Sequence, residues 1–131
     1  MFYLTKTPGI LKALYKSCIW NLSPVNNTVY LTFDDGPHPE ATPFILEQLA
    51  KYEAKGTFFC IGKNVVEYPA IYQQILEAGH ATGNHTHNHL NGWKTSTDRY
   101  IENILEAGKY ISSPLFRPPY GRITPFQIRQ L

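Results

Sequence analysis

The stretch VYLTFDDGP, residues 29–37, decides the fold prediction. Its first five residues alternate in character and are rich in β-branched and aromatic side chains, which is typical of a β-strand. The turn cluster Asp34-Asp35-Gly36-Pro37 follows at once, so the strand delivers two carboxylates to its C-terminal end. Because these side chains leave the backbone in different directions, one could hold a metal while the other stays free as a base. Taken alone, the same residues also fit a plain turn.

Strand and helix patterns alternate along the rest of the chain. We expect further strands at 57–61, 80–82 and 115–116, and helices at 42–55, 64–78, 96–111 and 124–131. Four alternations with short connections predict βαβ crossovers and a parallel α/β sheet. In such sheets chemistry gathers where the strands end, so the residues after each strand are the candidates for a site.

The length of 131 residues indicates one domain and excludes a complete (β/α)8 barrel, which needs about 200 residues or more. Residues 1–27 carry only a weak helical pattern, and we expect an accessory segment there. Lysines interrupt the apolar residues of this segment, at Lys6, Lys12 and Lys16, so we expect no signal peptide in it. No run is long enough to span a membrane, and a cytoplasmic location is the default expectation.

The composition is that of a globular protein, with 43% hydrophobic and 17% charged residues. A net charge of +2 is too weak to indicate nucleic acid as a partner. The 14% of aromatic residues and the ten prolines suit a rigid groove with flat apolar walls, which sugar rings bind well. Cys18 and Cys60 form no CxxC motif, and we expect two buried free thiols.

Three of the five histidines fall in HTHNH, residues 85–89. His85 and His89 are four apart, the spacing that places two imidazoles on one face of a helical turn, and we interpret them as metal ligands. A solvated His-rich loop is the alternative. His87 is out of phase, and we expect it at the surface or behind the ligands. The other two histidines are expected to be structural: His38 and His80.

Two imidazoles and one carboxylate leave coordination positions for water, as a catalytic divalent ion requires. The same donors could form the facial triad of a non-haem Fe(II) oxygenase. Those enzymes usually take their first histidine and carboxylate from neighbouring positions, whereas here the carboxylates lie about 50 residues before His85. Hydrolysis is therefore the simpler interpretation, with the metal lowering the pKa of its water and a free carboxylate taking the proton.

Arg117 is the one cation in a stiff loop, FRPPYG, residues 116–121. Its prolines fix φ, and Gly121 allows the backbone to approach a ligand closely. A structural loop exit explains the segment equally well. At the end of a fourth strand, however, Arg117 could pair with a free carboxylate and orient it, and backbone N–H groups of the loop could serve an oxyanion.

Together these three segments resemble the motifs of the polysaccharide deacetylase family, the NodB homology or carbohydrate esterase family 4 domain. TFDDG occupies residues 32–36, H-[S/T]-x-x-H residues 85–89 and R-x-P-Y-G residues 117–121, in family order. The resemblance runs from about Val29 to the C-terminus. It implies that residues 28–131 are the N-terminal part of such a domain, a partial distorted (β/α) barrel of about four βα units.

The resemblance also implies a function: metal-dependent removal of N-acetyl, sometimes O-acetyl, groups from an N-acetylglucosamine-containing polysaccharide such as chitin or peptidoglycan. It implies catalytic roles for Asp34 as base, for Arg117 as the residue that orients it, and for the backbone N–H of Tyr120 as oxyanion donor. Pro119 and Tyr120 would bind substrate. The metal ligands would be Asp35, His85 and His89. Zinc is the expected metal, with cobalt, nickel or manganese as alternatives.

The family pattern continues with an Asp/Trp segment and a Leu-x-His segment, whose histidine protonates the leaving amine. The 131 residues contain no histidine after His89 and no tryptophan after Trp93. We therefore expect a truncated form of a longer enzyme with impaired turnover, because a positioned acid contributes about 10²–10⁴ in rate. A non-catalytic carbohydrate- or metal-binding remnant of the fold is the alternative.

The expected partners follow from the same resemblance. They are an acetylated polysaccharide or oligosaccharide, without nucleic acid or a membrane span, and an extracytoplasmic or cell-wall role fits the family. Four βα units would also leave an open strand edge, and such an edge is a template for pairing. We therefore expect pairing with a second copy of the chain.

Overall fold

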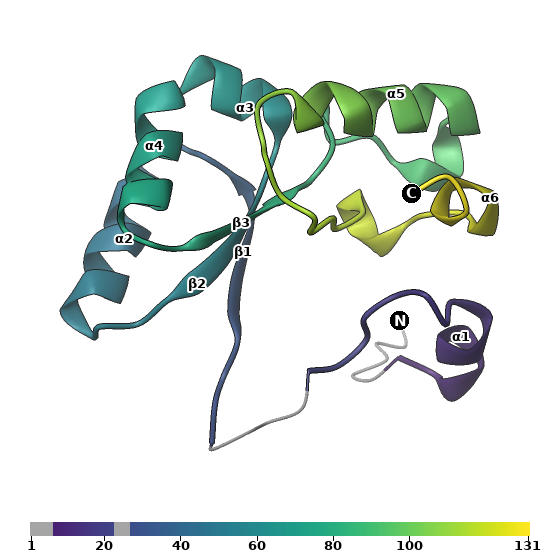
Figure 1. The fold of residues 1–131 in the computed structure, drawn as a ribbon, viewed down its shortest axis with the longest axis horizontal. Helices are drawn as coiled ribbons and strands as arrows, with labels where there is room; N and C mark the ends of the chain where they lie inside the picture. The colour runs from purple at the N-terminus through teal and green to yellow at the C-terminus, as the bar shows by residue number, and fades with distance from the viewer. Residues whose placement is uncertain (1–6, 23–26) are drawn as a thin grey trace, which may run out of the picture.

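The computed structural model describes residues 7–22 and 27–131, and Figure 1 shows their arrangement. A three-stranded parallel sheet has the order β1 (Leu31–Gly36), β2 (Gly56–Cys60) and β3 (Ala81–Asn84). The helices are α1 (Gly9–Leu14), α2 (Ala41–Lys51), α3 (Gly62–Glu67), α4 (Pro69–Glu77), α5 (Thr97–Gly108) and α6 (Pro125–Ile128), with 3₁₀ turns η1 (Gly92–Lys94) and η2 (Pro119–Gly121). The predicted alternation of parallel strands and helices is confirmed.

Helices α2 to α5 pack on one face of this sheet, against the alternate strand side chains that point that way. Phe58 and Cys60 of β2 lie in the main core with residues from α2 to α5: Leu49, Val65, Tyr72, Ile75 and Ala107. Phe33 of β1 stacks on Phe58 on the same face, with 4.9 Å between ring centroids. The intervening residue Phe59 faces the other way, toward the Arg117 guanidinium. The helix-free face thus carries Phe59, which is buried beneath the Arg117 guanidinium.

A second, smaller core joins α5 to the C-terminal segment. It contains Tyr100, Ile104 and Ile123, with Leu90, Ile101, Phe116 and Ile128 packed against it. Thr124 and Gln127 form a capping box at the start of α6. The Gln127 side chain is fully buried and donates to the carbonyl oxygens of Gly92 and Thr95, at 2.9 and 3.3 Å. This amide therefore ties α6 to η1.

The expected fourth strand at 115–116 is wrong: Phe116 makes only an isolated parallel bridge with Asn84. Prolines explain the difference, because they supply no N–H to a ladder and stand on both sides of the pair, at Pro114, Pro118 and Pro119. The sheet therefore holds three strands, and the four βα units expected from the sequence reduce to three strands with one bridge beside them.

The expected helix at 64–78 is also wrong in detail, since α3 ends at Glu67 and α4 begins at Pro69. Tyr68 between them has φ −125° and ψ 59°, because a residue before proline is driven out of the helical region. Other bounds differ by a few residues: β1 runs on through both aspartates to Gly36, α5 ends at Gly108, and α6 spans only 125–128.

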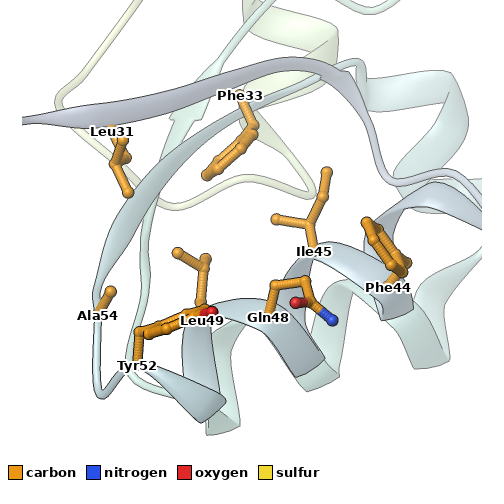
Figure 2. Close-up of a pocket in the computed structure, with 8 residues that line it drawn as sticks. All are labelled: Leu31, Phe33, Phe44, Ile45, Gln48, Leu49, Tyr52 and Ala54. Carbon is orange, nitrogen blue, oxygen red and sulfur yellow. The ribbon is translucent and has the colours of Figure 1, made fainter.

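An apolar groove of about 360 Å³ lies between β1 and α2 (Figure 2). In Figure 2, Leu31 and Phe33 point from β1 toward Ile45 and Leu49 of α2. Two aromatic side chains at the helix, Phe44 and Tyr52, are 61% and 72% exposed. Within the described residues β1 pairs with β2 alone, so its outer edge is open, as expected.

The expected accessory segment lies partly within the described residues, with 1–6 and 23–26 outside them. α1 occupies its middle, and the Tyr15 hydroxyl beyond α1 donates to the Ile123 carbonyl at 3.4 Å. Both cysteines are free. Cys60 is fully buried, and burial raises its pKa to about 12, whereas Cys18 is only half-buried. No helix in the described ranges has the length and apolar character that crossing a membrane requires.

Candidate metal centre and active site

A bulge at the end of β1 aims the two carboxylates. In the β1–β2 register Asp34 faces Phe59 and Gly36 faces Cys60, so Asp35 is an extra residue, with φ +68°. Consecutive residues of a regular strand point to opposite faces, and a bulge alters that direction. Asp34 therefore keeps to the helix-free face, while Asp35 turns toward the histidines at the C-terminal edge of the sheet.

The two histidines reach Asp35 through a turn that follows β3. The His85 backbone N–H donates to the Cys60 carbonyl at 2.9 Å, which continues the pairing with β2. Thr86 and His89 both have positive φ, 63° and 54°, and the Leu90 N–H donates to the Thr86 hydroxyl. The predicted pairing of His85 and His89 is confirmed, but an irregular turn rather than a helical turn produces it.

Asp35, His85 and His89 form a trio of metal-ligating atoms within 4.8 Å of one another. Asp35 Oδ1 lies 3.3 Å from His85 Nε2 and 3.1 Å from His89 Nε2. Ligand atoms that share one divalent ion at about 2.0–2.1 Å stand roughly 3.0–3.4 Å apart. These separations therefore fit a common ion, and the donor set is compatible with a divalent metal.

The protonation state of His85 is also compatible with a bound metal ion. Its Nδ1 lies 2.7 Å from the Arg117 carbonyl, an oxygen that only accepts, so Nδ1 carries the proton of the neutral ring. Burial lowers the pKa of His85 and favours that neutral form. The lone pair of Nε2 then faces the Asp35 carboxylate. Two electron-rich atoms at this distance are held together by a proton or a metal ion between them, so the geometry is compatible with metal binding.

Arg117 pairs with the other carboxylate. Its guanidinium donates to Asp34 Oδ1 at 2.7 Å and to the Thr32 hydroxyl at 3.0 Å, and it lies 4.0 Å from the centre of the Phe59 ring. Its backbone N–H donates to the Asn84 carbonyl at 3.0 Å. The side chain is therefore fixed between an aromatic face and two oxygen acceptors, and it holds one orientation of the Asp34 carboxylate.

Tyr120 closes the site on the side of His89. Its ring centroid lies 4.7 Å from that of His89, and its backbone has φ +60°. Within the described residues its backbone N–H donates to no backbone carbonyl. Pro119 beside it is fully buried, which favours a supporting role for Pro119 over direct contact with a substrate.

Asparagines that sequence reasoning missed hold the histidine turn. The Asn84 amide donates to the Ile104 carbonyl at 2.9 Å and accepts from the Thr86 N–H at 2.8 Å. Asn103 Oδ1 of α5 accepts from the N–H groups of residues 87 and 88. Asn84 adjoins the histidine motif and could have been suspected, whereas nothing in the local sequence marks Asn103.

The remaining histidines take supporting positions. His38 Nδ1 accepts from the N–H groups of Glu40 and Ala41 at the start of α2, and His80 Nδ1 accepts from the Gly56 N–H. Both are structural, as expected. The His87 ring is half-buried near Tyr110, its Nδ1 has no hydrogen-bond partner among the described residues, and it does not belong to the trio.

Comparisons with known proteins agree with this geometry. The family model described as polysaccharide deacetylase matches residues 22–129. The chain is 41% identical over 107 residues to a peptidoglycan-N-acetylglucosamine deacetylase of Bacillus cereus, covering 77% of the chain and 39% of that protein. It is 40% identical to a chitooligosaccharide deacetylase of Azorhizobium caulinodans, covering 72% of the chain and 49% of that protein.

A solved structure gives the same result for the fold. The peptidoglycan deacetylase PdaC of Bacillus subtilis matches with a TM-score of 0.75 at 33% identity, over 83% of this chain and 57% of that one. The chain thus spans about two fifths to somewhat over half of the length of these relatives.

Proposed function

Since this chain belongs to the polysaccharide deacetylase family, we propose that it removes N-acetyl, or O-acetyl, groups from an N-acetylglucosamine-containing glycan by metal-dependent hydrolysis. One observation carries the proposal: the Asp35, His85 and His89 trio stands beside a separate carboxylate, Asp34, that Arg117 holds. A metal trio and a free base side by side are what hydrolysis of an amide requires.

We propose zinc as the metal, because two imidazoles and one carboxylate with open positions are typical of catalytic zinc sites. Cobalt, nickel and manganese are alternatives for the same donors. When bound, the ion supplies Lewis acidity toward water and the acetyl carbonyl. Asp35, His85 and His89 would hold it, with the proton of His85 kept on Nδ1 by the Arg117 carbonyl.

The other residues act on protons and charge. Asp34 accepts a proton from the attacking water, and Arg117 holds the carboxylate in one orientation through its hydrogen bond to Oδ1. The backbone N–H of Tyr120 donates to the oxygen on which negative charge develops. The leaving amine also needs a proton, and we assign no described residue to that role. Slow turnover therefore remains our prediction for the 131-residue form.

The test is release of acetate from chitotetraose by the zinc-loaded chain, with and without a chelator. We expect Asp34→Asn to lower the rate by about 10²–10⁴ with its zinc content unchanged, because the amide cannot take the proton. Lys51→Gln, a charge change on α2, is the matched control and should keep the rate.

Two other results would contradict the proposal. No acetate release together with tight glycan binding would indicate the non-catalytic binding module instead. Turnover of 2-oxoglutarate in the iron-loaded chain would indicate an oxygenase.

A further inference from the structure

A second hollow, of about 420 Å³, opens directly beside the metal trio. His89 and Tyr120 form the wall that it shares with the trio, and the complete lining is His89, Leu90, Asn91, Lys94, Tyr120 and Arg122. Its volume falls in the range of small-ligand sites, roughly 300–1,000 Å³. A glycan unit in it would adjoin the unit whose acetyl group reaches the trio.

Two unneutralised cations distinguish this hollow. Lys94 and Arg122 are exposed, and neither pairs with a carboxylate within the described part of the chain. No aspartate or glutamate lines the hollow. The Arg122 guanidinium lies over the ring of Trp93, 5.2 Å from its centre, and this ring is 63% exposed. The charge on this wall is therefore available to a ligand.

The walls are built before any ligand arrives. The Gly92 N–H donates to the Arg122 carbonyl at 3.2 Å, and the Trp93 indole N–H donates to the Ile123 carbonyl at 3.3 Å. The buried Gln127 amide joins the same two segments. A Cβ at Gly92 would stand only 2.4 Å from the Arg122 carbonyl oxygen, so the contact requires glycine. The loops that carry Lys94 and Arg122 are thus fastened together.

We propose that this hollow is a subsite for an anionic glycan unit, in which Lys94 and Arg122 bind a carboxylate on the sugar next to the one that is deacetylated. This inference rests on the proposed function and narrows its substrate class. The exposed aromatic side chain of Tyr120 in the lining suits a sugar ring, while a lysine and an arginine suit a carboxylate. A neutral chitin chain offers no charged partner to either cation.

The experiment uses binding of three tetrasaccharides to the zinc-loaded chain, measured by calorimetry. The first is chitotetraose. The second alternates N-acetylglucosamine with N-acetylmuramic acid and carries free lactyl carboxylates. In the third those carboxylates are converted to methyl amides. A fourth probe, with the lactyl groups joined to a short peptide, tests whether a peptide carboxylate serves equally well. We expect the second to bind about three- to tenfold more tightly than the first and third.

Lys94→Gln and Arg122→Gln should each remove most of that preference and change chitotetraose binding less than twofold, while the distant Lys51→Gln should leave it intact. Equal affinity for the three tetrasaccharides, no binding at all, or equal losses in the variants for neutral and acidic glycans would overturn the inference.

Acetate release, measured in parallel, separates this test from the proposed function. Preferential binding without acetate release would contradict the function and keep the subsite. Equal turnover of neutral and acidic glycans by all variants would support the function and contradict the subsite.

Discussion

The two hollows of this molecule differ in position and in chemistry. The apolar groove lies along the flank of β1 against α2, lined largely by carbon side chains (Figure 2). The cationic hollow lies at the C-terminal edge of the sheet, against His89 and Tyr120. In Figure 1 the first region is the side of β1 and α2, and the second is the side of α5 and α6. Packed apolar side chains form the apolar groove, whereas loops with charged side chains form the cationic hollow.

The difference teaches where chemistry can reside in such a fold. In a parallel sheet, polar backbone ends and loops converge at the carboxyl edge, whereas the flanks hold the side chains that pack helices against strands. The proposed metal ligands, the proposed base and the two cations of the hollow all lie at that edge. The apolar groove, of about 360 Å³ against about 420 Å³, brings together no titratable pair. Substitutions in the two regions should therefore have different effects on metal binding and on stability.

Loss of a metal ligand should give the largest effect. We expect Asp35→Ala to weaken zinc affinity by at least about 100-fold, since changing even the partners of ligands typically costs 10–100-fold. Calorimetric zinc titration checks this. Phe44→Ala, in the apolar groove, is the control and should bind zinc as the native chain does. Native affinity in Asp35→Ala would remove the trio as the metal site.

The substitution Gly92→Ala should destabilise the part of the fold that forms the cationic hollow. Its Cβ would collide with a backbone oxygen, and such overpacking costs roughly 1–3 kcal/mol. The matched change is Gly108→Ala at the end of α5, where the new Cβ meets nothing within 4 Å. That change should raise the free energy of unfolding by about 0.5–1 kcal/mol. Urea unfolding measures both, and equal effects would contradict the close approach at Gly92.

His80 should make the sheet sensitive to acid. Burial, and then the charge of Lys55, lower the pKa of His80 in the folded chain. The unfolded chain therefore takes up the proton first, and stability is lost as the pH falls below about 6.5 through the folded value. Protonation would also set two donors, Nδ1 and the Gly56 N–H, against each other.

Urea unfolding of the metal-free protein between pH 7.5 and 5.5 checks this. His80→Asn, which keeps an acceptor, should show a smaller loss over that range. An unchanged pH slope in this variant would assign the sensitivity to other groups.

A substitution in the apolar groove should have the smallest effect on stability. Phe44 is mostly exposed, so Phe44→Glu should change the free energy of unfolding by only about 0.5 kcal/mol or less. Its charge should nevertheless reduce the pairing with a second copy that the open edge of β1 leads us to expect. Light scattering after size exclusion measures the mass of both forms. A native chain that is wholly monomeric would contradict the expected pairing.

Sequence patterns predicted what local chemistry encodes. Alternating side chains predicted β1, and turn residues placed Asp34 and Asp35 near its end. The spacing of His85 and His89 predicted their meeting. The short apolar pair Leu115-Phe116 was predicted to be a strand, but the prolines on both sides of it limit it to an isolated bridge. The prolines are visible in the sequence, so this difference could have been predicted.

Long-range contacts could not be predicted in this way. The bulge that turns Asp35 depends on its partner strand, and the support that Asn103 gives to the histidine turn depends on where α5 packs. Lys94 and Arg122 lie far apart in sequence and in unremarkable surroundings. Three long-range hydrogen bonds bring their loops together: Gly92 to the Arg122 carbonyl, Trp93 to the Ile123 carbonyl, and Gln127 to the Gly92 carbonyl.

Arg117 serves the site through two different parts of the same residue. Its guanidinium holds Asp34, while its main-chain carbonyl fixes the proton of His85. An alanine scan removes the first and leaves the second untouched, so it measures only half of what this position does. The other half belongs to the backbone at residue 117, and it persists in every side-chain variant that keeps the fold. Position 117 therefore links the proposed base to a proposed metal ligand through two groups that mutation cannot remove together.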